Sequence, residues 1–120
     1  MIEKTVLDYL GGVFESIPVL MEVPEVPSET YSTFPEKLIV IELVGKRKSN
    51  HVCAASIAFQ SYAMSLYDAA ALDESVRAAV EGMPALANVG GVTLSSNYNF
   101  TDTRTKRYRY QCVYDIYYVE

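Results

Sequence analysis

The sequence predicts an α+β fold, in which two helices pack on one face of a mainly antiparallel sheet of about five strands. Apolar residues recur at intervals of three and four in residues 2–15 and 65–82, which is the helical repeat. Several other segments alternate apolar and polar residues, and turn-like stretches separate them in pairs, which favours hairpins. The order of helix, three strands, helix and two strands is typical of the α+β class. A length of 120 residues predicts a single domain over residues 1–120.

The first element is an amphipathic helix over residues 2–15. The Gly11-Gly12 pair weakens it, since each Gly costs up to about 1 kcal/mol against Ala, and Pro18 prevents its extension. The apolar run 17–23 predicts a first strand. The residues expected to face the core from the helix are Ile2, Val6, Tyr9 or Leu10, Val13 and Phe14.

Residues 22–37 (EVPEVPSETYSTFPEK) predict a long loop, because they combine three prolines with glutamates and hydroxyl residues. Loops of this length are usually functional or mobile. We expect residues 24–36 to be exposed and mobile in the isolated protein and to become ordered against a neighbour. Residues 37–44 and 51–63 predict two antiparallel strands joined by a turn over residues 45–50 (GKRKSN).

The second helix begins after Ser65, a good N-cap with Asp68 three residues later, and ends near Gly82 before Pro84. The acid pair Asp73-Glu74 is expected on its exposed face. A loop over residues 85–91, with Gly90-Gly91 as the turn, then leads to a strand over residues 92–100. The residues expected to be buried on this helix are Leu66, Ala69, Ala70, Leu72, Val76, Ala79, Val80 and Met83.

The stretch from Tyr98 to Glu120 carries the strongest pattern in the chain. After a polar loop over residues 101–106, apolar residues alternate strictly, which predicts a final strand over residues 108–119 with one face on the core. Cys53 and Cys112 lie inside alternating runs, so we expect two buried free thiols rather than a disulfide. The alternating residues are Tyr108, Tyr110, Cys112, Tyr114, Ile116 and Tyr118.

Charge is unevenly distributed along the chain. The net charge is −5, yet residues 1–42 hold eight acids and two bases, while residues 46–48 and 104–109 hold seven of the ten Lys and Arg. Either the two basic patches are solvated loops, or copies of the protein stack acidic surface against basic surface. The RYRY run at residues 107–110 interleaves Arg with aromatic rings that can stack on bases. The overall negative charge nevertheless argues against nucleic-acid binding.

The sequence offers little that could perform catalysis. The single histidine, His51, falls in the predicted hairpin turn without ligands at metal-binding spacing. Nucleophile-elbow, dinucleotide-binding and P-loop motifs are not found. We therefore expect no catalytic residue, metal or cofactor. Ten tyrosines favour a protein that binds proteins. The acidic N-terminal segment does not have the pattern of a signal peptide, and no apolar run is long enough to predict a membrane span.

Several segments together carry a resemblance to a known family. They are the N-terminal amphipathic helix, the run IPVLMEVPEVP, the strand LIVIELVG with the following KRKSNHVCAASIAFQSYA, the Ala-rich helix, and the ending GGVTLSSNYNFTDTRTKRYRYQCVYDIYY. In their order, and in the F-T-D…R-Y-Q-C…Y ending, they resemble the small tail-terminator and tail-completion proteins of long-tailed bacteriophages and prophages. The resemblance covers nearly the whole chain, although no single motif in it is diagnostic.

The resemblance implies a structural virion protein without enzyme activity. Copies would form a hexameric ring on the head-proximal end of the tail tube, stop tube polymerisation and provide a surface for head joining. Its partners would be other copies, the tail tube protein and a head-completion or neck protein. Its place would be the virion tail, assembled in the bacterial host cytoplasm. The residues implied at protein interfaces are Glu25, Glu29, Tyr31, Phe34, Lys46, Arg47, Lys48, Arg104, Lys106 and Arg107.

Two other function classes stay open on the sequence alone. A head–tail connector or neck adaptor would act in the same virion with a different partner. A small-ligand or nucleic-acid binding domain is a further alternative, against which the charge and the motifs argue.

Overall fold

The computed structural model describes residues 1–101 and 107–119. It confirms the predicted α+β class, with a five-stranded sheet in the order β1-β2-β3-β5-β4. The β1–β2 pair is parallel and the other pairs are antiparallel. The elements are α1 (Ile2–Val13), β1 (Val19–Leu20), β2 (Leu38–Ser49), β3 (Val52–Ala63), α2 (Leu66–Glu81), the 3-10 turn η1 (Met83–Ala85), β4 (Val89–Asn99) and β5 (Tyr108–Tyr118).

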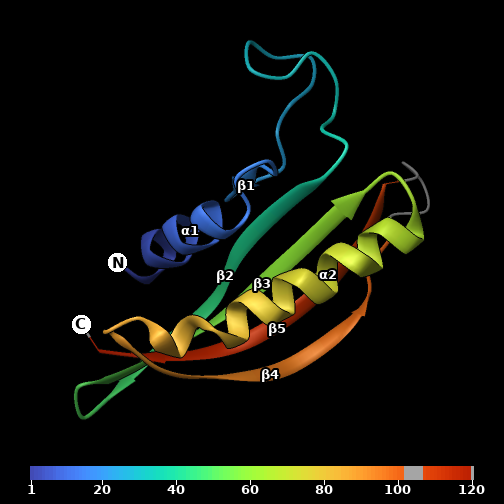
Figure 1. Cartoon of the computed structure of the whole chain (residues 1–120). Helices are drawn as coiled ribbons and strands as arrows, with labels where there is room; N and C mark the ends of the chain where they lie inside the picture. The colour runs from blue at the N-terminus through green and yellow to red at the C-terminus, as the bar shows by residue number, and fades with distance from the viewer. Residues whose placement is uncertain (102–106, 120) are drawn as a thin grey trace.

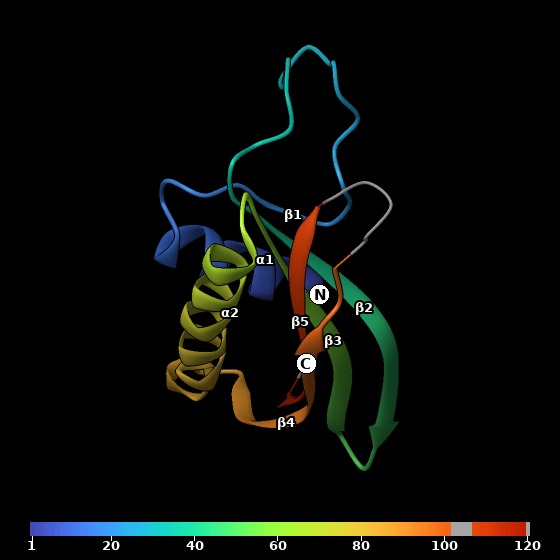
Figure 2. The ribbon, with the colours of Figure 1, turned by 90° about the vertical axis from the view of Figure 1, so that its right-hand side faces the viewer.

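Both helices cover the same face of the sheet, as Figure 2 shows from the side. The main core lies between them and the sheet, and α1 contributes Ile2, Val6 and Leu10 to it. From β5, the predicted alternation supplies Cys112, Tyr114, Ile116 and Tyr118. Cys53 and Cys112 are both buried free thiols, as the sequence predicts.

The basic segment that the sequence predicts as a turn is part of a strand. β2 continues through residues 45–49, where Lys46, Arg47 and Lys48 pair with β3. The chain reverses at Asn50 and His51, which have φ angles of 50° and 71°. A two-residue hairpin turn with both angles positive matches the twist of the flanking strands. The prediction of a turn at 45–50 is wrong because basic residues are well tolerated on an exposed strand edge.

Two further predicted boundaries differ from the structure. The first strand, predicted at 17–23, contains only Val19–Leu20, because the chain then turns away from the sheet. The turn predicted at Gly90-Gly91 is instead part of β4, where the register shifts between Val89 and Gly91. Residues 83–85 form the 3-10 turn η1, which reverses the chain earlier than the glycines indicate.

The N-terminus of α2 agrees with the prediction, since the Ser65 hydroxyl accepts a hydrogen bond of 3.1 Å from the Asp68 N–H. The prediction that Asp73 lies on the exposed face is wrong, because its exposure is only 2%. Asn97 Nδ2 on β4 and Arg77 Nε one turn along α2 donate to its carboxylate at 2.9 and 3.2 Å. These two donors make burial of the carboxylate possible. Two residues expected in the core are instead largely exposed, namely Val13 and Leu66.

Candidate interaction surface

The sheet has a second face, opposite the helices, which we call the open face. Side chains alternate between the two faces of a strand, so the polar residues between the core positions lie on this side. The pairing places Gln60 beside Gln111 and Tyr62 beside Arg109 across β3 and β5. No helix lies over this face in the part of the chain that the structure describes.

The predicted long loop forms an arm, residues 21–37, that projects beyond the end of the sheet (Figure 1). Its base is fixed on the open face, where Leu20 and Phe34 pack against Leu38, Val40 and Tyr62. The rings of Phe34 and Tyr62 meet edge to face, with centroids 5.8 Å apart. The arm is therefore anchored at both ends while the segment between them extends away from the sheet.

The outer part of the arm carries three residues predicted at an interface. Glu25 and Glu29 are exposed, and Tyr31 is half-buried. The Ser28 N–H donates to the Tyr31 carbonyl at 2.7 Å, and the Tyr31 N–H donates to Ser28 Oγ at 3.0 Å. These bonds give the tip of the arm a local turn. The expected mobility of this segment stays a prediction.

Two arginines hold the base of the arm and the end of β4 together. The Arg107 guanidinium lies 4.1 Å from the centre of the Phe34 ring, so two of the predicted interface residues are in contact. Arg109 stacks on Phe100 at 4.1 Å and donates from Nη1 to the Tyr62 hydroxyl at 2.9 Å. Both arginines thus act inside the domain, where cation–π contacts contribute about 0.5–1 kcal/mol each.

A ladder of hydrogen-bonded polar side chains crosses the open face from β2 to β4. Gln60 Nε2 donates to Glu42 Oε2 at 3.2 Å and to Gln111 Oε1 at 3.0 Å. Gln111 Nε2 then donates to the Tyr98 hydroxyl at 2.5 Å. The two glutamines are buried, at 7% and 8% exposure, and each is hydrogen-bonded. The ladder thus links side chains of β2, β3, β5 and β4 across the open face.

The other predicted basic residues lie at the far end of β2 from the arm. Lys46 forms an ion pair of 3.0 Å with Glu3 on α1, and this ammonium lowers the pKa of the Glu3 carboxyl. Arg47 and Lys48 are exposed and make no salt bridge within residues 1–101 and 107–119. Beside them is a hollow of about 190 Å³, here called the basic hollow, lined by Arg47, Lys48, Ser49, Val52, Ala54 and Tyr117.

The predicted interface residues therefore form two separate groups. The arm residues and Arg107 lie at one end of the sheet, and Lys46, Arg47 and Lys48 lie at the other. Arg104 and Lys106 fall outside the described residues. Sequence reasoning missed the glutamine ladder, Tyr62 and Arg109. Their alternation with the core residues was visible, but only the strand pairing reveals which polar residues are neighbours.

Buried ionisable groups in the core are unsuited to catalysis. Burial raises the pKa of the Cys112 thiol to about 12, and such a thiol is a poor nucleophile near neutral pH. Burial also raises the pKa of Tyr114, whose hydroxyl donates to Glu81 Oε2 at 2.5 Å. Across residues 1–101 and 107–119, no group of three or more His, Cys, Asp or Glu is placed to hold a metal ion.

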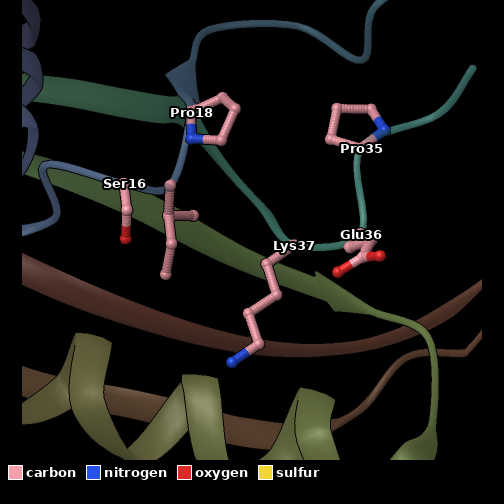
Figure 3. Close-up of a pocket in the computed structure, with 6 residues that line it drawn as sticks. Ser16, Pro18, Pro35, Glu36 and Lys37 are labelled. Carbon is pink, nitrogen blue, oxygen red and sulfur yellow. The ribbon is translucent and has the colours of Figure 1, made fainter.

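A hollow of about 360 Å³ lies between the chain segments 16–18 and 35–37 (Figure 3). Ser16, Glu36 and Lys37 are its hydrophilic side chains, and in Figure 3 the Lys37 ammonium extends away from the Glu36 carboxylate. Small-molecule sites usually have polar groups that converge on the ligand. The arrangement around this hollow does not have that property.

Neither the helices nor comparisons with known proteins point to a particular site. Within the described residues, none of the helices is long and apolar enough to cross a membrane. No protein-family model matches the chain, and no curated protein sequence matches it significantly.

Proposed function

We propose that this protein is a structural, non-enzymatic component of a phage tail. Copies form a ring, a hexamer by the resemblance, on the head-proximal end of the tail tube. The ring ends tube polymerisation and presents a surface to a head-completion or neck protein. Its place is the virion tail, after assembly in the cytoplasm of the bacterial host.

The observation that carries this proposal is the separation of opposite charges along the molecule. The arm, residues 21–37, contains four Glu and one Lys. Between Leu43 and Tyr67, the chain contains Lys46, Arg47 and Lys48 and no acidic residue. An acidic arm and a basic hairpin on one molecule favour head-to-tail contact between copies, and such contacts make closed rings when the rotation between copies closes.

Purified tail tubes provide the direct test. We expect the protein to bind at one end of each tube and to stop further growth when tube subunits are added. Electron microscopy would count capped ends, and tube length would report termination. The control is the charge-reversed variant Arg47→Glu with Lys48→Glu, which we expect to fold normally and to cap more slowly, because exposed charges contribute little to stability but influence association.

A connector or neck adaptor would behave differently in the same experiment. It would leave tube ends free and bind purified portal or head-completion protein instead. Preference for portal or head-completion protein over tube ends would reject the terminator role.

A further inference from the structure

We propose that the basic hollow is the socket for the arm of a second copy of this chain. The contact would be made by the segment Glu22-Val23-Pro24-Glu25-Val26-Pro27 of one copy in the hollow of the next. This inference deepens the proposed function and rests on it, because it assigns the two surfaces that join neighbours in the ring.

The size of the hollow fits side chains rather than a separate small molecule. Its volume of about 190 Å³ is below the roughly 300–1,000 Å³ of usual small-molecule sites. Val52, Ala54 and the Tyr117 ring supply apolar lining, and Val52 is 52% exposed although it sits in a strand. A single apolar side chain of a partner would cover this surface.

The charges around the hollow select an acidic partner. Arg47 and Lys48 both line it, and the register places Arg47 on the same face as Ala54, whereas Lys48 shares the opposite face with Cys53. Asp115, the nearest acidic residue along this face of β5, already accepts a hydrogen bond of 2.6 Å from the Ser56 hydroxyl. An apolar surface beside the Arg47 guanidinium, with the Lys48 ammonium at the edge of the same strand, favours an apolar residue next to a carboxylate.

The arm presents that combination twice. In Glu22-Val23 and in Glu25-Val26 a carboxylate adjoins a valine, and Val23 is 38% exposed. Pro24 and Pro27 have no N–H to donate, which limits the pairing of this segment as an added strand. We therefore infer that side chains make the contact, with a valine on the apolar lining and a glutamate against Arg47.

In this structure the arm does not make this contact within its own chain, because it projects beyond the end of the sheet opposite the basic hollow. Val23 and Glu25 lie three and five residues beyond Leu20, so a fully extended backbone carries their Cα atoms at most about 11 and 18 Å from that of Leu20. Leu20 pairs with Val40, and Arg47 is seven residues further along β2, which is about 23 Å at the rise of a strand. With the arm in this position the contact joins two copies, and repetition of it produces a chain of copies or a closed ring.

Cross-linking between two differently sized versions of the protein tests the contact directly. One carries Val23→Cys, the other carries Ser49→Cys at the hollow and a size tag, and a short bis-maleimide joins thiols that approach each other. The native cysteines are buried and should react little. The matched control replaces Ser75, exposed on α2, with Cys in the tagged chain.

We expect severalfold more cross-linked heterodimer with Ser49→Cys than with Ser75→Cys. Adding Glu22→Lys and Glu25→Lys to the arm should remove the excess, and adding Arg47→Glu and Lys48→Glu to the tagged chain should restore it. Equal yields with the two tagged chains would overturn the inference, as would an excess that charge reversal leaves unchanged. Circular dichroism on each variant checks that the fold is intact.

The experiment separates this contact from the proposed function, since it contains no tail tube. The specific cross-link in a protein that does not bind tubes would reject the tail role and retain the contact. Tube capping without the cross-link would reject the contact and retain the role.

Discussion

Asp73 is a buried carboxylate whose removal should lower the stability of this domain measurably. Its carboxylate is buried and accepts hydrogen bonds from Asn97 on β4 and Arg77 on α2. A hydrogen bond to a charged group contributes about 1.5–3 kcal/mol. The Arg77 side chain is 30% exposed, so its share is below about 1 kcal/mol. We therefore expect Asp73→Ala to lower the free energy of unfolding by about 2–4 kcal/mol.

Thermal and urea unfolding, followed by circular dichroism, would measure this loss. For a domain of 120 residues, about 4 °C of melting temperature corresponds to 1 kcal/mol, so Tm should fall by about 8–16 °C. The matched control is Glu74→Ala, one residue along and exposed, which should change stability by less than about 0.5 kcal/mol. Asp73→Asn keeps an acceptor for Asn97 and should lie between the two. Equal effects at Asp73 and Glu74 would refute the reasoning.

Three further predictions concern the core, the arm and the ion pair at α1. Burial raises the pKa of the folded Cys112 thiol to about 12, so the unfolded chain loses this proton at a lower pH. The free energy of unfolding should therefore fall between pH 9 and 12 by up to about 1.4 kcal/mol per pH unit. In Cys112→Ala, urea denaturation measured against pH should show a shallower alkaline slope. Phe34→Ala removes an edge-to-face ring pair and a cation–π contact, so it should lower the free energy of unfolding by about 1–2.5 kcal/mol. It should also speed hydrogen exchange at the base of the arm. Exchange as slow as in the unaltered protein would contradict this anchoring. The lowered pKa of Glu3 gives stability that is present above the ordinary glutamate pKa and is lost as pH falls through the folded value. Glu3→Gln should remove this loss at acid pH, which amounts to less than about 1 kcal/mol. A stability profile at acid pH that is the same in Glu3→Gln and the unaltered protein would contradict this prediction.

The fold class follows from the sequence because periodicity depends on local geometry. The alternation in residues 108–118 and the cap at Ser65 both produce what they predict. The strand at 45–49 was not predictable in the same way, since basic residues and a glycine are typical of turns and are also acceptable on a strand edge. Only the pairing with β3 decides between the two.

The candidate site was less predictable than the fold, because its contacts join residues that are far apart in the chain. Asp73 is a carboxylate next to another on a helix, and the sequence gives no sign that Asn97 will reach it from β4. The glutamine ladder depends in the same way on strand order. Phe34 and Arg107 were both expected at an interface, but their contact with each other depends on the path of the arm.

The anchoring of the arm at both ends has a consequence for how tightly a partner surface can bind it. A free tail of similar length would lose most of its backbone freedom on binding, at about 1–2 kcal/mol per residue fixed. Here Leu20 and Phe34 already hold the two ends, and Pro24 and Pro27 restrict the path between them. A partner surface would meet a loop whose two ends are fixed during folding, so that only the segment between them still has to be ordered. The small area that such a loop offers can then give useful affinity, because preorganisation lowers the cost of binding.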